Sequence, residues 1–226
     1  MLQKYEIAAV IGRRLGLRSY LEIVTPTTGR KFDCVDATQF PDRSRAVYYC
    51  PSDWSDGAAI NYRTDGDGSD LSFADRKFDL VFVDSWHEYT NSRDDIALAL
   101  RLVAPKGVVL LHDCNPESAE KARPKLPEEC VKGQCDRQWN GETYAALIDR
   151  FLGANDADYV TIDDDHGCGM ILPGRKIEGP RPSASLISRW KDLKHSSERF
   201  AFFDIHRADL LRLRSPQWLL ETWSPS

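Results

Sequence analysis

Two short and almost wholly apolar runs stand out in the chain, and each stops at a cluster of acids and histidines. The first run is Leu80–Val83 and the second is Val108–Leu111. Runs of this length, rich in β-branched and aromatic residues, favour buried parallel strands over helices. The segment between them has the spacing of a helix that buries one face, carried by Ile96, Ala99, Leu100 and Val103. The pattern predicts a βαβ unit.

The polar residues that end the two runs are the strongest functional signal. Asp84 and His87 follow the first run, and His112 and Asp113 follow the second. Because neighbouring parallel strands end at one edge of a sheet, we expect these four side chains to converge. Two carboxylates and two imidazoles could hold Mg²⁺ or another divalent ion through Asp84 and Asp113, or supply a general base. Asp84 could instead cap the next helix, and a lone histidine is more often structural. The repetition of the cluster favours a site.

The rest of the pattern completes an α/β fold. A helical stripe from Ile7 to Leu15 ends at Gly16. Further strands are predicted at residues 20–24, 46–50 and 58–62. Residues 115–141 lack periodicity, leave the strand end that carries His112 and Asp113, and are predicted to form a lid or loop over the site. Their cysteines, Cys130 and Cys135, are a weak metal signal and are interpreted as free thiols.

The sequence Phe78-Asp-Leu-Val-Phe-Val-Asp-Ser-Trp-His-Glu-Tyr89, followed by Leu100-Arg-Leu-Val-Ala-Pro-Lys-Gly-Val-Val-Leu-Leu-His-Asp-Cys114, resembles class I S-adenosylmethionine-dependent methyltransferases of the small-molecule type. The resemblance covers roughly residues 18 to 173. It implies a Rossmann-like fold, with a mostly parallel seven-stranded sheet and an antiparallel closing hairpin, and S-adenosylmethionine as cofactor.

The resemblance also implies the cofactor residues, and it shows one departure. The positions that match are Glu22, Thr25, Thr28, Gly29, Asp53, Asp84 and Ser85. Val24 stands where the family has the first glycine of its cofactor turn, and Pro26 stiffens that turn. A side chain and a fixed φ therefore stand where backbone normally approaches the cofactor.

Length and composition indicate one domain with an appendage. The chain has 226 residues, and we divide it into an α/β domain over 1–173 and a linker with a helical extension over 174–226. The extension carries Trp190, Phe200, Phe202, Phe203, Trp218 and Trp223. These aromatic side chains pack either on the same domain, which we favour, or on a second copy. The protein is accordingly expected to be a monomer or a homodimer.

Charge and hydropathy limit the classes of partner that the sequence predicts. The net charge of −5 gives no electrostatic reason to expect nucleic acid as a partner. No stretch approaches the length of a membrane span, and the first residues lack a signal-peptide pattern, so the expected location is the cytoplasm.

Two functions follow from these features. The first is an O-methyltransferase of a small molecule or saccharide, in which His87 or His112 deprotonates the acceptor and Asp84 with Asp113 orients it, directly or through a metal. The alternative is a methyltransferase-like protein that has lost cofactor binding and acts as a binding or scaffolding subunit, or in other metal-assisted chemistry.

Overall fold

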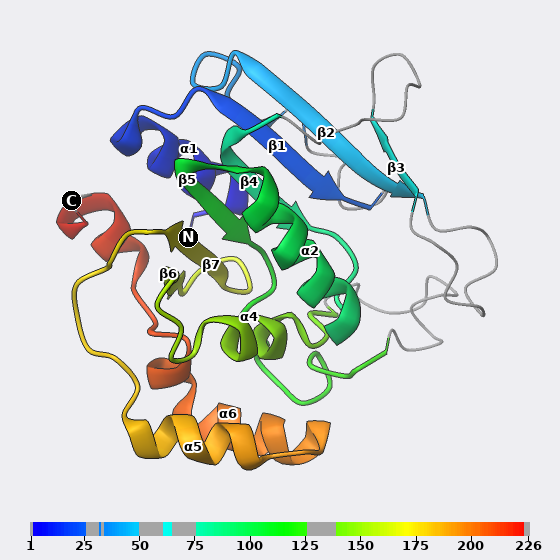
Figure 1. Ribbon diagram of the computed structural model, residues 1–226, viewed down its shortest axis with the longest axis vertical. Coiled ribbons are helices and arrows are strands. Elements are labelled where there is room, and N and C mark those ends of the chain that lie inside the picture. The colour runs from blue at the N-terminus through cyan, green and yellow to red at the C-terminus, as the bar shows by residue number, and fades with distance from the viewer. Residues whose placement is uncertain are drawn as a thin grey trace.

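A computed structural model describes residues 2–25, 32, 34–49, 61–64, 76–125 and 139–223 (Figure 1). The strands are β1 (Ser19–Val24), β2 (Asp42–Tyr49), β3 (Asn61–Thr64), β4 (Phe78–Asp84), β5 (Val103–Leu111), β6 (Ala157–Ile162) and β7 (Cys168–Pro173). The helices are α1 (Lys4–Leu15), α2 (Tyr89–Leu102), α4 (Thr143–Phe151), α5 (Ala184–Asp192), α6 (Ser196–Leu210) and a short π-helical turn, η2 (Trp218–Thr222).

The strands form one seven-stranded sheet in the order β3-β2-β1-β4-β5-β7-β6. The β1 strand is parallel to β2 and β4, and β4 is parallel to β5. The β7 strand runs antiparallel to both β5 and β6, as expected for the closing hairpin. The β3 strand is also antiparallel to β2, which the sequence had not indicated. Only residues 50–60 separate these two strands, and a parallel pair needs a crossover of a dozen or more residues.

Successive side chains along the central strands point to opposite faces of the sheet and pack into two separate cores. Leu21 of β1 and Val81 of β4 point to the face covered by α2 and α4, whereas Tyr20 and Leu80 point to the face covered by α1 (Figure 1). This arrangement explains the continuous apolar runs, because a strand buried on both faces has no solvent side to mark with polar residues. Gly16 ends α1 in the left-handed conformation, with a φ of 66°, as its position after the helical stripe predicts.

The extension beyond residue 173 is packed onto the same chain. Trp190 of α5 and Phe203 of α6 are fully buried in the core that also contains α2 and α4, and in Figure 1 the two helices form a further layer beyond α4. After α6, Arg212 makes a buried ion pair with Asp158 of β6. The expected packing within one chain is thus confirmed. The domain division at residue 173 stays a prediction.

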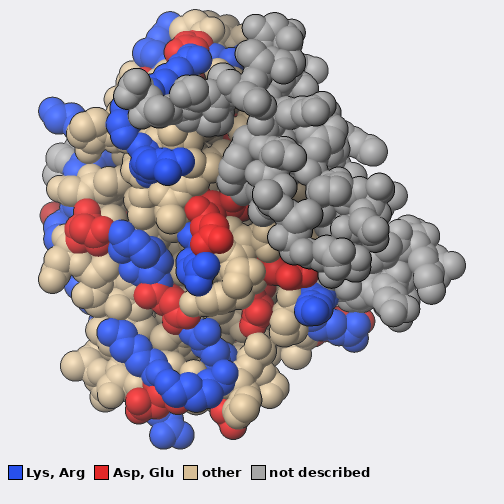
Figure 2. Space-filling model, turned by 45° about the vertical axis from the view of Figure 1, so that its right-hand side comes forward, with Lys and Arg blue, Asp and Glu red and all other residues tan. Residues whose placement is uncertain are grey.

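The charged surface is mixed. On the face in Figure 2, Lys and Arg side chains lie among Asp and Glu over the coloured residues. Within the described ranges, no helix has the length and apolar character needed to cross a membrane.

Candidate active site

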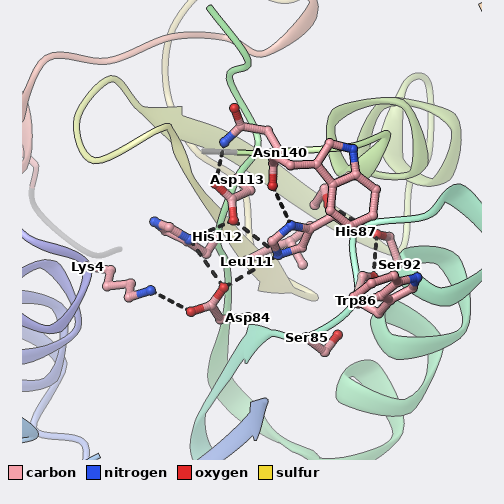
Figure 3. Close-up of polar contacts among 12 residues, drawn as sticks. Lys4, Asp84, Ser85, Trp86, His87, Ser92, Leu111, His112, Asp113 and Asn140 are labelled. Atoms are coloured by element: carbon pink, nitrogen blue, oxygen red, sulfur yellow. Dashed lines mark hydrogen bonds and ion pairs between the residues drawn. The ribbon is translucent and has the colours of Figure 1, made fainter. Parts of the chain in front are cut away.

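The predicted residues meet at the carboxyl ends of β4 and β5. Asp84 is the last residue of β4, while His112 and Asp113 directly follow β5. The backbone N–H of His112 donates to the Val83 carbonyl at 2.9 Å, so the parallel ladder continues to the site. His112 Nδ1 is 3.3 Å from Asp84 Oδ1 and 3.0 Å from Asp113 Oδ2. The expected convergence is confirmed (Figure 3).

His87 approaches the same carboxylates from the turn between β4 and α2. Its Nε2 is 3.1 Å from Asp113 Oδ2 and 3.6 Å from Asp84 Oδ1. Its Nδ1 lies 2.9 Å from the backbone carbonyl of Trp139. Because a carbonyl accepts only from an N–H, Nδ1 carries a proton and Nε2 is the nitrogen that gains or loses one.

Residues 139–141 contact both His87 and Asp113 and fix their positions. The Asn140 amide donates to Oδ1 of Asp113 and leaves Oδ2 facing the two histidines. Asp113 itself has a φ of 60°, a left-handed conformation that is uncommon outside glycine and is often found at functional sites. This segment belongs to the predicted loop over the site, and its last residues do pack on the site. Its residues 126–138, with Cys130 and Cys135, lie outside the described residues.

Two further charged residues, distant in sequence, complete the cluster. Lys4, the first residue of α1, places its Nζ 2.5 Å from Asp84 Oδ2 (Figure 3). Asp165, in the β6–β7 turn, places Oδ2 3.6 Å from His112 Nε2. Nothing in the local sequence marks either residue, since each is far along the chain from its partner.

The carboxylates of the cluster are held ionised. Burial opposes ionisation of Asp84, but His112 and Lys4 outweigh it and keep the pKa of Asp84 well below its usual value. Burial is likewise outweighed at Asp113, chiefly by His112 and His87, and its pKa is lowered. At Asp165, burial is outweighed by the hydrogen bond and charge of His112, and the pKa falls to about 2.

The histidines respond in the opposite direction. Burial disfavours the charged form of His112, but Asp113 and Asp84 outweigh it and raise the pKa of His112 well above its usual value. Burial is also outweighed at His87, whose pKa is raised mainly by Asp113 and Asp84. With both imidazoles protonated, three cationic side chains balance three carboxylates, since Lys4 supplies the third positive charge.

The cofactor residues implied by the resemblance divide into two groups. Glu22 and Thr25 are buried at the carboxyl end of β1, next to β4, where Asp84 and Ser85 are also buried. Ser85 donates its hydroxyl to the buried Asp95 of α2 and so faces away from the acidic cluster. Thr28, Gly29 and Asp53 lie outside the described residues, as does Pro26. Val24 is fully buried in β1.

A small, partly open pocket lies beside the cluster. It is lined by Val83, Asp84, Ser85, Trp86, His87, Ser92, Leu111, His112 and Thr143, and its enclosed space is about the size of one water molecule. Trp86 packs edge-on against Trp139, with ring centroids 5.1 Å apart. An aromatic wall, several hydroxyls and a histidine surround this space, which admits a molecule no larger than water.

A metal is chemically compatible with three of these side chains. One ligand atom each of Asp84, His87 and Asp113 lies within 4.8 Å of the others. The second polar atom of each side chain already has a partner: Lys4 for Asp84, the Trp139 carbonyl for His87 and Asn140 for Asp113. The hydrogen bonds to His87 and Asp113 are of the kind that orients metal ligands in proteins.

Gly141 offers a test of how the loop positions His87. A Cβ at this position would lie 2.1 Å from the His87 carbonyl oxygen, and its φ is 59°. We expect Gly141→Ala to displace His87 and to lower the free energy of unfolding by about 2 kcal/mol or more, through clash and strain together. Urea unfolding measures the effect. Gly174→Ala is a control, because it shares a positive φ but meets no atom within 4 Å. An equal loss in both variants would show that strain alone acts.

Comparison with known proteins agrees with the sequence pattern. Residues 21–114 match the family model described as "Methyltransferase domain". No curated protein matches the chain. Similar solved structures include the O-methyltransferase TomG from Streptomyces achromogenes in complex with SAM, at 15% identity, over 75% of this chain and 78% of that one, with a TM-score of 0.43. Another is an O-methyltransferase from Bacillus cereus in complex with SAH, at 11% identity, over 75% of this chain and 80% of that one, with a TM-score of 0.40. The match identifies residues 21–114 as similar to a methyltransferase domain, in the part of the chain that holds β1 to β5 and the acidic cluster.

Proposed function

We propose that the protein transfers a methyl group from S-adenosylmethionine to a hydroxyl of a small molecule or saccharide. The observation that carries this proposal is the convergence of Asp84, His87, His112 and Asp113 at the strand ends of a methyltransferase fold. Trp86, Ser92 and Thr143 line the pocket beside these residues and would meet an acceptor that enters there. The mixed charge on the face in Figure 2 gives no support for a polyanionic acceptor.

The described residues fit the cofactor at β1. Glu22 Oε2 is buried and, among the described residues, has no hydrogen-bond partner. A buried carboxyl oxygen without a partner suits a cationic N–H donor, such as the amino group of the methionine part, whose charge would favour the ionised form of Glu22. Glu22 and Thr25 would therefore hold the cofactor, with Asp84 and Ser85 at the neighbouring strand end. When bound, S-adenosylmethionine supplies a methyl group activated by a positively charged sulfur.

His87 is the residue best placed to take the acceptor proton. It lines the pocket, and its Nδ1 proton is held by the Trp139 carbonyl, so only Nε2 is available to accept. His112 is a poorer base because Asp84, Asp113 and Asp165 surround it and stabilise its charged form. We assign His112 instead to holding Asp84 and Asp113 in place, from which their carboxylates orient the acceptor.

Cofactor binding is the first test. We expect saturable heat on titration with S-adenosylhomocysteine, and a rise in melting temperature with either that product or S-adenosylmethionine. Absence of heat and of any change in melting temperature at about 1 mM ligand would contradict the proposal. Such a result would favour the alternative of a binding or scaffolding subunit, which the buried side chain of Val24 supports.

The role of His87 gives a second, separate test. Since His87 must lose its proton to act, kcat/KM is expected to rise with pH, and the raised pKa places the midpoint above the usual histidine value. His87→Gln should lower kcat about a hundredfold or more and leave S-adenosylhomocysteine binding unchanged. Methyl transfer to a panel of phenols and sugars, followed by mass spectrometry, measures both effects. An unchanged rate in the variant would exclude His87 as the base.

A divalent metal is a second candidate for the same acids. The set Asp84, His87 and Asp113 supports it, because one ligand atom of each lies within 4.8 Å of the others. A bound cation would polarise the acceptor oxygen, and the nitrogen ligand would favour Mn²⁺, Co²⁺ or Zn²⁺ over Mg²⁺.

A further inference from the structure

The amino-terminal helix contributes a charged side chain to the acidic cluster. Lys4 Nζ contacts Oδ2 of Asp84, and the Lys4 side chain is only 16% exposed. In Figure 3 Lys4 reaches the cluster from the side opposite His87. Asp84 therefore has one oxygen bound by the ammonium and the other turned to the two histidines.

Lys4 is anchored by its backbone as well as by its charge. Its own N–H donates to Asp165 Oδ2 at 2.7 Å, and the N–H of Leu2 donates to Asp164 Oδ2 at 2.5 Å. Asp165 and His166 both have positive φ, 47° and 63°, in the β6–β7 turn that makes these contacts. Two consecutive non-glycine residues in this conformation are unusual and need support from their surroundings. The turn thus fixes the start of α1 over the site.

A fixed ammonium at this place changes which cations the acids can bind. Asp84 and Asp113 attract a divalent ion, but an ion beside Oδ1 of Asp84 would stand close to the positive charge of Lys4 in a largely buried setting, where repulsion is weakly screened. We propose that Lys4 is a resident counter-ion of the site, which neutralises Asp84 from the amino-terminal helix and weakens the binding of divalent cations between Asp84 and Asp113. This inference concerns cation binding alone and does not depend on methyl transfer.

Mn²⁺ binding, followed by the electron paramagnetic resonance signal of the free ion, tests the proposal. We expect Lys4→Met to bind Mn²⁺ about tenfold or more tightly than the natural protein, because the competing charge is gone. Lys4→Arg keeps the charge and should bind like the natural protein. Adding Asp84→Asn to Lys4→Met should abolish the gain. If Lys4→Met does not fold, Lys4→Gln, which keeps a hydrogen-bond donor without charge, replaces it with the same expectation.

Lys106→Met is the matched control for net charge, since Lys106 is exposed in the amino-terminal half of β5, away from the site. It should leave Mn²⁺ affinity unchanged. An equal gain in Lys106→Met would overturn the proposal, because the effect would then come from overall charge. An affinity of Lys4→Met equal to or below that of the natural protein would overturn it too. If neither the natural protein nor Lys4→Met binds Mn²⁺, the proposal is also overturned. The carboxylates would then have no affinity for the ion that Lys4 could weaken.

Discussion

Phe203→Ala is expected to lower the free energy of unfolding by about 3–5 kcal/mol, the usual range for removing a fully buried aromatic ring. Phe203 lies in α6, beyond the predicted α/β domain, and yet it is fully buried. Its ring centroid is 4.4 Å from that of Tyr144 in α4 and 5.9 Å from that of Phe200. The loss would show that the extension is an integral layer of the fold.

Ile205→Ala, in the same helix, is the control. Ile205 is 77% exposed, so its truncation should change the free energy of unfolding by no more than about 0.5 kcal/mol. Chemical unfolding followed by both circular dichroism and tryptophan fluorescence measures the two variants. Two separate transitions, with only the first shifted by Phe203→Ala, would mean that α5 and α6 unfold independently of the sheet.

The sheet and the centre of the site could be predicted because short, continuous segments of the sequence determine both. The apolar runs that became β4 and β5 are buried on both faces, and this burial leaves a continuous signal. Parallel pairing then placed Asp84 next to His112 and Asp113 without further information. His87 followed because it lies only three residues beyond the end of β4.

The residues around that centre could not be predicted, because tertiary packing brings them there. Lys4 is 80 residues from Asp84 and belongs to a helix whose sequence marks only its buried stripe. Asn140 contacts Asp113 across 27 residues, most of them without periodicity. Asp165 looked like one of several acids in a turn, and only the docking of α1 shows that it holds the Lys4 backbone. Long-range polar contacts leave no periodic trace.

The direction of β3 illustrates a different limit. The sequence indicated a strand at residues 58–62, and the structure has one at Asn61–Thr64. Strand propensity does not encode direction, which depends on the length of the connection and on the edge that the strand meets. The closing hairpin, by contrast, was predicted from the resemblance to methyltransferases, and the structure confirms its antiparallel pairing.

A buried carboxyl group in β1 leads to the second large effect. Glu22 is fully buried, and burial raises the pKa of Glu22 to about 8, against a smaller opposing effect of the hydrogen bond from the Tyr5 hydroxyl. In the unfolded chain the same group loses its proton near pH ~4.3. Between these two values the folded protein binds one more proton than the unfolded one, so rising pH destabilises the fold. The loss is about 1.4 kcal/mol per pH unit.

Glu22→Gln should remove this dependence, because the amide stays neutral at every pH. From pH 5 to pH 8, the free energy of unfolding of the natural protein should fall by about 4 kcal/mol relative to that of Glu22→Gln. Urea unfolding at each pH gives the difference, from which titrations common to both proteins cancel. Glu178→Gln, at an exposed position, should follow the natural protein. Parallel curves for the natural protein and Glu22→Gln would show that Glu22 ionises normally inside the fold, and that its charge already has a partner without the cofactor.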